Sequence, residues 1–273
     1  MKIGFQGVLG AYTHLALEEF FADKPHEVVP YSTYKDLLDA VETGALDYAV
    51  VPVENSTSGR VAEVHLHVGH ANVFLVGEHY KSISHCLLAV PGCGAQVKEV
   101  YSYEPALSQC IHTLHSMGLV PKKASDTAEA AKQVAEWGDP TKAALASSLA
   151  GEIYGLDIVR RDMQDTCDNT TRFSIVGPKL EIADASLPCK IALLFETQSI
   201  PAALYKALGG FATNGVNLTR LESYVGGATF KTARFFAEIE GHVQQPAVQR
   251  ALEELQFFSQ NVRVLGCYPR AEK

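Results

Sequence analysis

The sequence lacks an excess of basic residues and a long apolar run, and each absence argues against a class of protein. Lys and Arg number 23 against 31 Asp and Glu, which gives a formal net charge of −8 over 273 residues. A nucleic-acid partner is not expected, because phosphate backbones need a basic face. No apolar run approaches the roughly 18 residues of a membrane span, and no apolar signal segment follows Met1. We therefore expect a cytoplasmic protein with no membrane partner.

The sequence also lacks a regular pattern of metal ligands. Its 6 cysteines show no C-x-x-C spacing, which favours buried free thiols over a disulfide scaffold. His65, His67 and His70 form one histidine cluster. On a helix only residues three or four apart share a face, so His65 would lie apart from His67 and His70. We therefore expect no metal site.

The first two thirds of the chain alternate between strand-like and helix-like segments. Thr33 followed by Asp36 resembles a capping box that opens a helix, and the apolar run 48–53 is typical of a strand buried on both faces. The pattern predicts an α/β fold with a parallel sheet, in two groups that suggest two lobes with a cleft. Strands are expected at 2–6, 48–53, 73–76, 87–90, 97–101 and 172–177, and helices at 13–23, 33–44, 61–68, 105–117 and 126–137.

A second region follows residues 178–188, which have the composition of a linker. Six segments after it have the order β-α-β-β-α-β, the ferredoxin-like arrangement. They are strands at 190–195, 216–223, 232–239 and 262–268 and helices at 201–213 and 245–259.

Two polar segments follow or precede buried strands and are candidates for a site. Residues 54–59 come directly after the strand at 48–53, at the strand end where open α/β sheets bind ligands. The second, residues 168–173, places Arg172 beside two hydroxyls, and a guanidinium can bind a carboxylate through its planar fork. A capped helix start and a surface charge remain the alternatives. The glycines between Gly4 and Gly10 form either a plain turn or, with Thr13, an anion-binding helix start.

Together these segments resemble the prephenate dehydratases that carry a C-terminal ACT domain. The matching motifs are Phe5-Gln-Gly-Val-Leu-Gly-Ala-Tyr-Thr13, Pro52-Val-Glu-Asn-Ser-Thr-Ser-Gly59 and Thr171-Arg172-Phe173. The resemblance implies a two-lobed dehydratase domain, like a periplasmic binding protein, followed by a ferredoxin-like ACT domain. The expected division is a dehydratase domain at 1–178 and an ACT domain at 189–270, with lobes at about 1–75 with 158–178 and at 76–157.

The resemblance also implies a reaction: prephenate loses water and carbon dioxide and becomes phenylpyruvate, with no cofactor. Thr171 is expected to donate a hydrogen bond to the leaving hydroxyl, and Asn55 and Arg172 complete the expected catalytic set. The residues expected to bind substrate are Thr13, Ser56, Ser58, Thr170 and Phe173.

Family members bind phenylalanine through two ACT segments, and both depart from the family pattern here. Pro201-Ala-Ala-Leu204 stands where Pro-Gly-Ala-Leu is usual, and Glu222-Ser-Tyr-Val225 replaces Glu-Ser-Arg-Pro. We therefore expect weakened or altered inhibition by phenylalanine. The resemblance further implies homodimers or homotetramers. The corresponding effector residues are Ala202, Ala203, Leu204, Asn217, Leu218, Glu222 and Ser223.

Three other functions remain open at this point. The substrate can instead be arogenate, which has an amino group in place of the side-chain keto oxygen. A family relative that decarboxylates prephenate without aromatising it is a second alternative, although such a relative is expected to lack the Thr171 hydroxyl and the ACT domain. The third is a non-catalytic binding protein that senses an amino acid.

Overall fold

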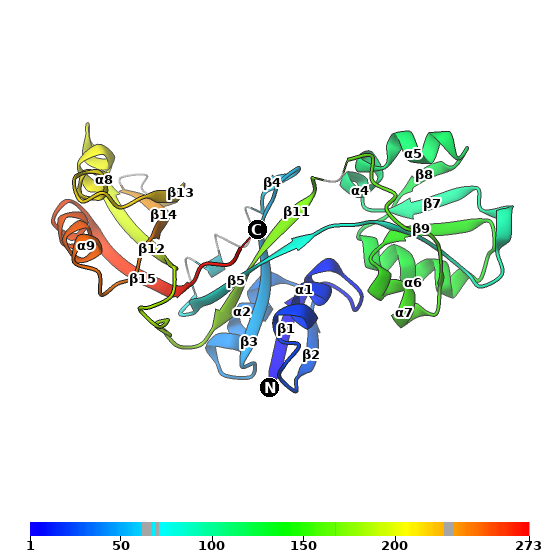
Figure 1. Ribbon diagram of the computed structural model, residues 1–273, viewed down its shortest axis with the longest axis horizontal. Coiled ribbons are helices and arrows are strands. Elements are labelled where there is room, and N and C mark those ends of the chain that lie inside the picture. The colour runs from blue at the N-terminus through cyan, green and yellow to red at the C-terminus, as the bar shows by residue number, and fades with distance from the viewer. Residues whose placement is uncertain (62–66, 69–70, 167, 227–231, 273) are drawn as a thin grey trace. The chain divides into compact units, whose positions relative to one another are not determined.

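The computed structural model describes residues 1–61, 67–68, 71–166, 168–226 and 232–272, which form three β-sheets with helices packed on them (Figure 1). His65 and His70, and most of the helix expected at 61–68, lie outside the described residues. Within the described part of the chain, no helix is long and apolar enough to cross a membrane.

The first sheet collects the N-terminal strands and one late strand in the order β2-β1-β3-β11-β5, with β4 paired to β3. Ala49, Val50 and Val51 of β3 are fully buried, as expected of a strand covered on both faces. The predicted capping box is confirmed at the start of α2, where Thr33 Oγ1 accepts the Asp36 N–H at 3.1 Å. The elements are β1 (Lys2–Gln6), α1 (Tyr12–Phe20), β2 (Glu27–Tyr31), α2 (Tyr34–Glu42), β3 (Tyr48–Asn55), β4 (Gly59–Arg60), β5 (Phe74–Ser82) and β11 (Thr170–Gly177).

The second sheet is mixed, so the prediction of a purely parallel sheet is wrong here. Its order is β10-β6-β9-β7-β8; β6 runs antiparallel to β9 and β10, while β7 is parallel to β8 and β9. Strand β6 follows β5 with no helix between them, so the alternation of strands and helices does not determine its direction. The elements are β6 (Cys86–Ala89), η1 (Gly94–Gln96), β7 (Glu99–Ser102), α4 (Glu104–Gln109), α5 (Ile111–Ser116), β8 (Val120–Lys123), α6 (Thr127–Trp137), β9 (Lys142–Ala146), α7 (Ser148–Tyr154) and β10 (Asp157–Arg160).

The single helix predicted at 105–117 is broken into α4 and α5 at Cys110. The Asp165 carboxylate accepts the N–H groups of His112 at 3.0 Å and Thr113 at 2.9 Å, which satisfies the first turn of a new helix. The Asp165 N–H in turn donates to the carbonyl of Gln109 at 2.8 Å. The break makes Gln109 the last residue of α4.

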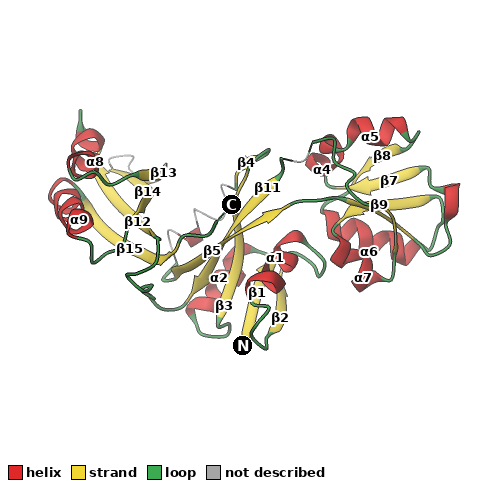
Figure 2. Ribbon diagram, in the orientation of Figure 1, coloured by secondary structure: helices red, strands yellow, loops and turns green. Residues whose placement is uncertain are grey.

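The third sheet has the predicted β-α-β-β-α-β order, and the order β13-β14-β12-β15 is that of a ferredoxin-like fold. Helices α8 and α9 cover one face of it (Figure 2), over a core that includes Leu193, Phe195, Phe235 and Leu255. The elements are β12 (Cys189–Gln198), α8 (Ala203–Thr213), β13 (Leu218–Gly226), β14 (Thr232–Glu240), α9 (Pro246–Phe258) and β15 (Gln260–Pro269).

The ferredoxin-like region is tied to strand β5 and the residues before it. A buried ion pair joins Lys190 to Glu78 at 2.9 Å, and Arg263 donates to the carbonyl of Val73 at 3.0 Å. The compact units of the chain consequently differ from the division expected near 178–189. One comprises Met1–Leu37, Val50–Val61 and His79–Phe173, and the other comprises Leu38–Ala49, Ala62–Glu78 and Ser174–Lys273.

The turn before α1 requires glycine at position 10. Gly10 has φ +87°, and a Cβ added there would lie 2.7 Å from the Cα of Ala150. The Gly10 N–H donates to His14 Nδ1 at 3.0 Å, and its carbonyl accepts from the buried Ser147 hydroxyl. The start of α1 is thereby fixed against the start of α7.

We expect Gly10→Ala to lower the free energy of unfolding by about 2–5 kcal/mol, the sum of a left-handed backbone and a steric clash. Gly44→Ala is the matched control, because Gly44 has φ +76° but nothing within 4 Å of its Cβ position. It should cost only about 1–2 kcal/mol. Urea denaturation of both variants measures the difference, and equal losses would contradict the packing described for Gly10.

Candidate active site

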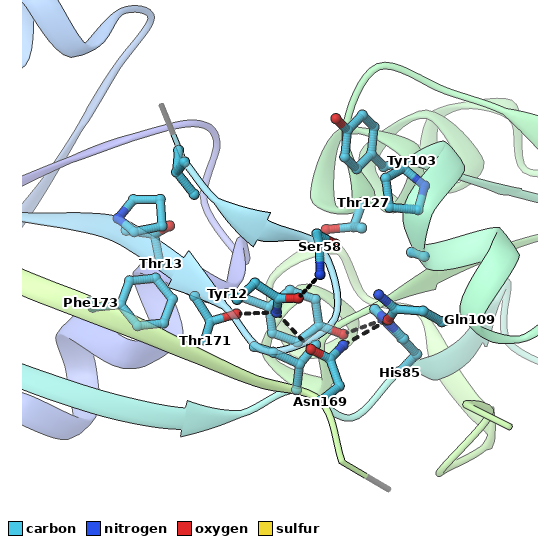
Figure 3. Close-up of a pocket in the computed structure, with 16 residues that line it drawn as sticks. Tyr12, Thr13, Ser58, His85, Tyr103, Gln109, Thr127, Asn169, Thr171 and Phe173 are labelled. Carbon is cyan, nitrogen blue, oxygen red and sulfur yellow. Dashed lines mark hydrogen bonds between the residues drawn. The ribbon is translucent and has the colours of Figure 1, made fainter. Parts of the chain in front are cut away.

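A cavity of about 210 Å³ lies among polar side chains from both the first and the second sheet. Its volume is below the usual range for drug-sized ligands, so it fits a small metabolite. Figure 3 shows the lining side chains and the hydrogen bonds that join them. The lining residues are Tyr12, Thr13, Pro52, Asn55, Ser58, Val61, Ile83, His85, Tyr103, Pro105, Ala106, Gln109, Thr127, Asn169, Thr171 and Phe173.

The side chain of Asn55, at the end of β3, is held in one orientation. Its Oδ1 accepts the backbone N–H groups of Thr57 at 3.0 Å and Ser58 at 2.8 Å. Backbone N–H groups can only donate, so the opposite end of this amide must be the NH₂ group. That group donates to Asn169 Oδ1 at 2.6 Å and to Thr171 Oγ1 at 2.9 Å.

The hydrogen bonds continue from Asn169 to His85 with their directions determined. Since Asn169 Oδ1 accepts from Asn55, its Nδ2 donates to Gln109 Oε1 at 2.7 Å. Gln109 Oε1 also lies 3.1 Å from His85 Nε2, so Nε2 must carry a hydrogen. His85 Nδ1 is 2.8 Å from the Tyr12 hydroxyl. Burial lowers the pKa of His85, and the bond to Gln109 opposes that shift.

Successive side chains of strand β11 point to opposite faces of the sheet. Thr171 and Phe173 line the cavity, whereas Arg172 between them is buried and lines neither this cavity nor its neighbour. The structure therefore does not place Arg172 where the sequence suggested a carboxylate anchor. Thr171 Oγ1 accepts from Asn55, and the hydroxyl hydrogen of Thr171 is left for a partner in the cavity.

Thr13 and Ser58 also line the cavity as predicted, but Ser56 and Thr170 do not. The Ser56 hydroxyl donates to the carbonyl of Asp168 at 2.6 Å and accepts the Thr170 N–H at 2.9 Å. The backbone N–H of Ser56 donates to the Thr170 carbonyl at 2.9 Å. These two residues hold the two polar segments together beside the site.

Charged groups lie in an adjoining outer cavity of about 870 Å³, which shares Asn55 and Ser58 with the inner one. Arg60, Asp126 and Glu129 line the outer cavity, while no described residue that lines the inner cavity is Lys, Arg, Asp or Glu. Across the described part of the chain, no three His, Cys, Asp or Glu side chains gather where they could hold a metal.

Four residues that complete the hydrogen-bonded set were not among the predicted site residues: Tyr12, His85, Gln109 and Asn169. Tyr12 and Asn169 are sequence neighbours of the predicted Thr13 and Thr170. The alternation of strand side chains and the first turn of α1 could therefore have pointed to them. His85 directly precedes β6 and Gln109 ends α4, and no sequence spacing relates them to the two polar segments.

A family model described as prephenate dehydratase matches residues 3–181. The chain belongs to the prephenate dehydratase family. The family implied by the sequence motifs is thereby confirmed.

Relatives cover nearly all of the chain. A bifunctional N-acyl-homoserine lactone acylase/prephenate dehydratase of Komagataeibacter europaeus is 41% identical over 98% of this chain and 95% of its own length. Arogenate dehydratase/prephenate dehydratase 2 of Arabidopsis thaliana is 36% identical over 98% of this chain and 73% of its own length. The crystal structure of an Arthrobacter aurescens prephenate dehydratase in complex with L-Phe has a TM-score of 0.90 and 28% identity, over 99% of this chain and 90% of that one.

Asn55→Asp tests the hydrogen-bond directions. The variant keeps the acceptor for Thr57 and Ser58 but turns a carboxylate oxygen toward Asn169 Oδ1, so an NH₂ donor is replaced by repulsion. We expect the free energy of unfolding to fall by about 1–3 kcal/mol, measured by urea denaturation. Thr57→Ala, at an exposed neighbour that keeps its backbone N–H for Asn55, should cost less than about 1 kcal/mol. An Asn55→Asp protein as stable as the wild type would rule out this arrangement of donors.

Proposed function

We propose that the chain is a prephenate dehydratase, and the observation that carries the proposal is the Thr171 hydroxyl. It lies on the wall of a small cavity, and its oxygen accepts from Asn55, which leaves its hydrogen for a partner in the cavity. The family to which the chain belongs supports the same reaction.

The proposed reaction consumes one proton. The bond between the ring and its carboxylate breaks, the electron pair of that bond completes the aromatic ring, and the bond to the ring hydroxyl breaks. The products are phenylpyruvate, carbon dioxide and hydroxide, and the hydroxide takes up a proton to become water. Thr171 is a weak acid, so its contribution is a placed hydrogen bond that stabilises the charge developing on the leaving oxygen, and the proton comes ultimately from solvent.

The lining of the cavity suits the other parts of this reaction. Phe173, Pro52 and Ile83 offer apolar surface to a ring, and no described residue of the lining is Lys or Arg. A carboxylate in an apolar setting loses carbon dioxide more readily because the charge disperses in the transition state. Thr13 and Ser58 offer further hydroxyl donors for substrate oxygens. Arg172 is assigned no contact with substrate.

We propose further that residues 189–270 form an ACT domain that follows a dehydratase domain at 1–178. The ferredoxin-like topology supports it, as does the L-Phe bound to the Arthrobacter aurescens protein. A phenylalanine effector, a homodimeric or homotetrameric assembly and a cytoplasmic location belong to the same proposal.

Two of the proposed effector residues already form contacts with other side chains. Ala202, before α8, has φ +62°, a left-handed conformation that suits the glycine usual in the family. Glu222 is paired with Arg220 at 2.7 Å and Asn217 donates to Glu240 at 2.9 Å. Ala203 and Leu204 are in the first turn of α8, and Leu218 and Ser223 are on β13. These contacts support weakened binding of phenylalanine.

Thr171→Ala should lower kcat on prephenate by about 10²–10⁴ with little change in KM, because the lost hydrogen bond acts on the leaving oxygen. Thr171→Ser should recover much of the loss. Thr170→Ala is the matched control, since the Thr170 side chain does not line the cavity. The assay follows phenylpyruvate and, with arogenate as substrate, phenylalanine.

The ratio of kcat/KM values for prephenate and arogenate identifies the preferred substrate. An N-acyl-homoserine lactone is included because the Komagataeibacter europaeus relative is named as an acylase as well. Absence of turnover on both ring substrates, from folded protein, would overturn the proposed function in favour of an amino-acid-sensing binding protein.

Inhibition by phenylalanine should be weak in the wild type and stronger in the double variant Ala202→Gly with Tyr224→Arg. The glycine relieves the left-handed alanine, and the arginine restores the usual family residue. We expect the inhibitory concentration to fall by about tenfold, equivalent to about 1.4 kcal/mol of binding, in steady-state assays. Complete inhibition of the wild type by micromolar phenylalanine would contradict the expectation.

A further inference from the structure

The hydrogen bonds around His85 require one more hydrogen than neutral side chains supply. The Tyr12 hydroxyl lies 2.9 Å from the carbonyl of Ser84 and 2.8 Å from His85 Nδ1, and His85 Nε2 lies 3.1 Å from Gln109 Oε1. Three contacts need three hydrogens. Tyr12 supplies one and neutral His85 supplies one.

The missing hydrogen cannot come from Gln109. Its Oε1 already accepts from Asn169, whose direction follows from Asn55 and the backbone N–H groups of Thr57 and Ser58. With neutral His85, Tyr12 donates to Nδ1 and leaves the Ser84 carbonyl without that donor. With protonated His85, Nδ1–H donates to Tyr12, Tyr12 donates to Ser84, and every contact has its hydrogen.

The other titratable groups around His85 are either neutral or hydrogen-bonded to other residues. Burial raises the pKa of Tyr12 and of the Cys86 thiol, and raises the pKa of Cys110 to about 12, so these three are uncharged near neutral pH. The nearby carboxylates are bonded elsewhere: Asp126 caps α6, Asp162 accepts from Ser84 and Asp165 caps α5. Arg161 interacts electrostatically with Cys86.

Among the described residues that line the inner cavity, His85 is therefore the one side chain that can become a cation. The described lining holds no Lys or Arg, and His85 is 3% exposed. Prephenate carries two carboxylates. A dianion near an imidazole favours the protonated form, and His85 already has hydrogen-bond acceptors in place on both ring nitrogens for that form.

We propose that binding of the dianionic substrate is coupled to the uptake of a proton by His85, which makes His85 a proton-linked binding residue of the site. The inference rests on the proposed function, because it takes a dicarboxylate as the ligand. His85 donates to Gln109 and Tyr12, and amide groups stand between it and Thr171, so its proton stays on the imidazole during turnover. The proton consumed by the reaction is a separate one.

The sign of the pH dependence follows from the two states. In the free protein burial lowers the pKa of His85 below its ordinary value of about 6.5, and bound substrate raises it. Between these two pKa values, binding takes up a proton and the affinity weakens as pH rises, by up to about tenfold per pH unit. Below the lower value the uptake disappears.

Calorimetric titration of prephenate into the full-length Thr171→Ala protein near pH 7 tests the inference, because turnover in this variant is about 10²–10⁴ times slower and the heat of binding is read before product accumulates. Titrations in buffers of different ionisation enthalpy give the number of protons taken up, and we expect a value approaching one per site. In Thr171→Ala combined with His85→Gln the value should fall to zero, since glutamine keeps a donor for Gln109 but does not ionise. Thr171→Ala with His112→Gln, an exposed histidine on α5, is the control and should keep the uptake.

The outcomes separate the two proposals. Binding of prephenate without proton uptake, or with uptake that persists in the His85→Gln background, overturns the role of His85 and leaves the dehydratase assignment intact. No binding of prephenate by the Thr171→Ala protein, together with no turnover by the wild type, overturns the proposed function itself. If His85→Gln does not fold, NMR titration of the His85 ring with and without prephenate decides, and an unchanged pKa contradicts the inference.

Discussion

Two backbone N–H groups that donate to one amide oxygen determine the hydrogen-bond directions along the cavity wall from Asn55 to His85. Thr57 and Ser58 donate to Asn55 Oδ1, and every later donor and acceptor follows from that assignment as far as His85. The backbone cannot reverse its role, so this part of the site is ordered before any ligand arrives. Such an arrangement reduces the reorganisation needed at the moment of reaction.

The pleat of β11 places adjacent residues on opposite faces of the strand, so that only alternate side chains reach the cavity. Thr171 and Phe173 face the cavity with a hydroxyl and a ring, while Arg172 is buried away from it. The result is a polar inner cavity whose described lining contains no Lys, Arg, Asp or Glu, with Arg60 and two carboxylates in the outer one.

The sequence predicted the elements whose signals are local. The apolar run of β3, the capping box at Thr33 and the β-α-β-β-α-β order of the last region are confirmed, because burial, capping and turn chemistry are decided within a few residues. The direction of β6 and the break at Cys110 were missed, since both depend on partners distant in sequence, as with Asp165 and α5. Asn55 and Thr171 were predicted from motifs, whereas His85 and Gln109 become neighbours of them only in the folded chain.

The residues between 177 and 189 are more than a connector. Ile182 pairs with Cys267 of β15, and the Ala183 N–H donates to the Cys267 carbonyl at 2.9 Å. Strand β15 is an edge of its sheet, and an open edge is a template on which another chain can add a strand. By occupying part of that edge, the connecting segment protects it from unwanted intermolecular pairing, and among the described strands β13 remains as the other edge of this sheet.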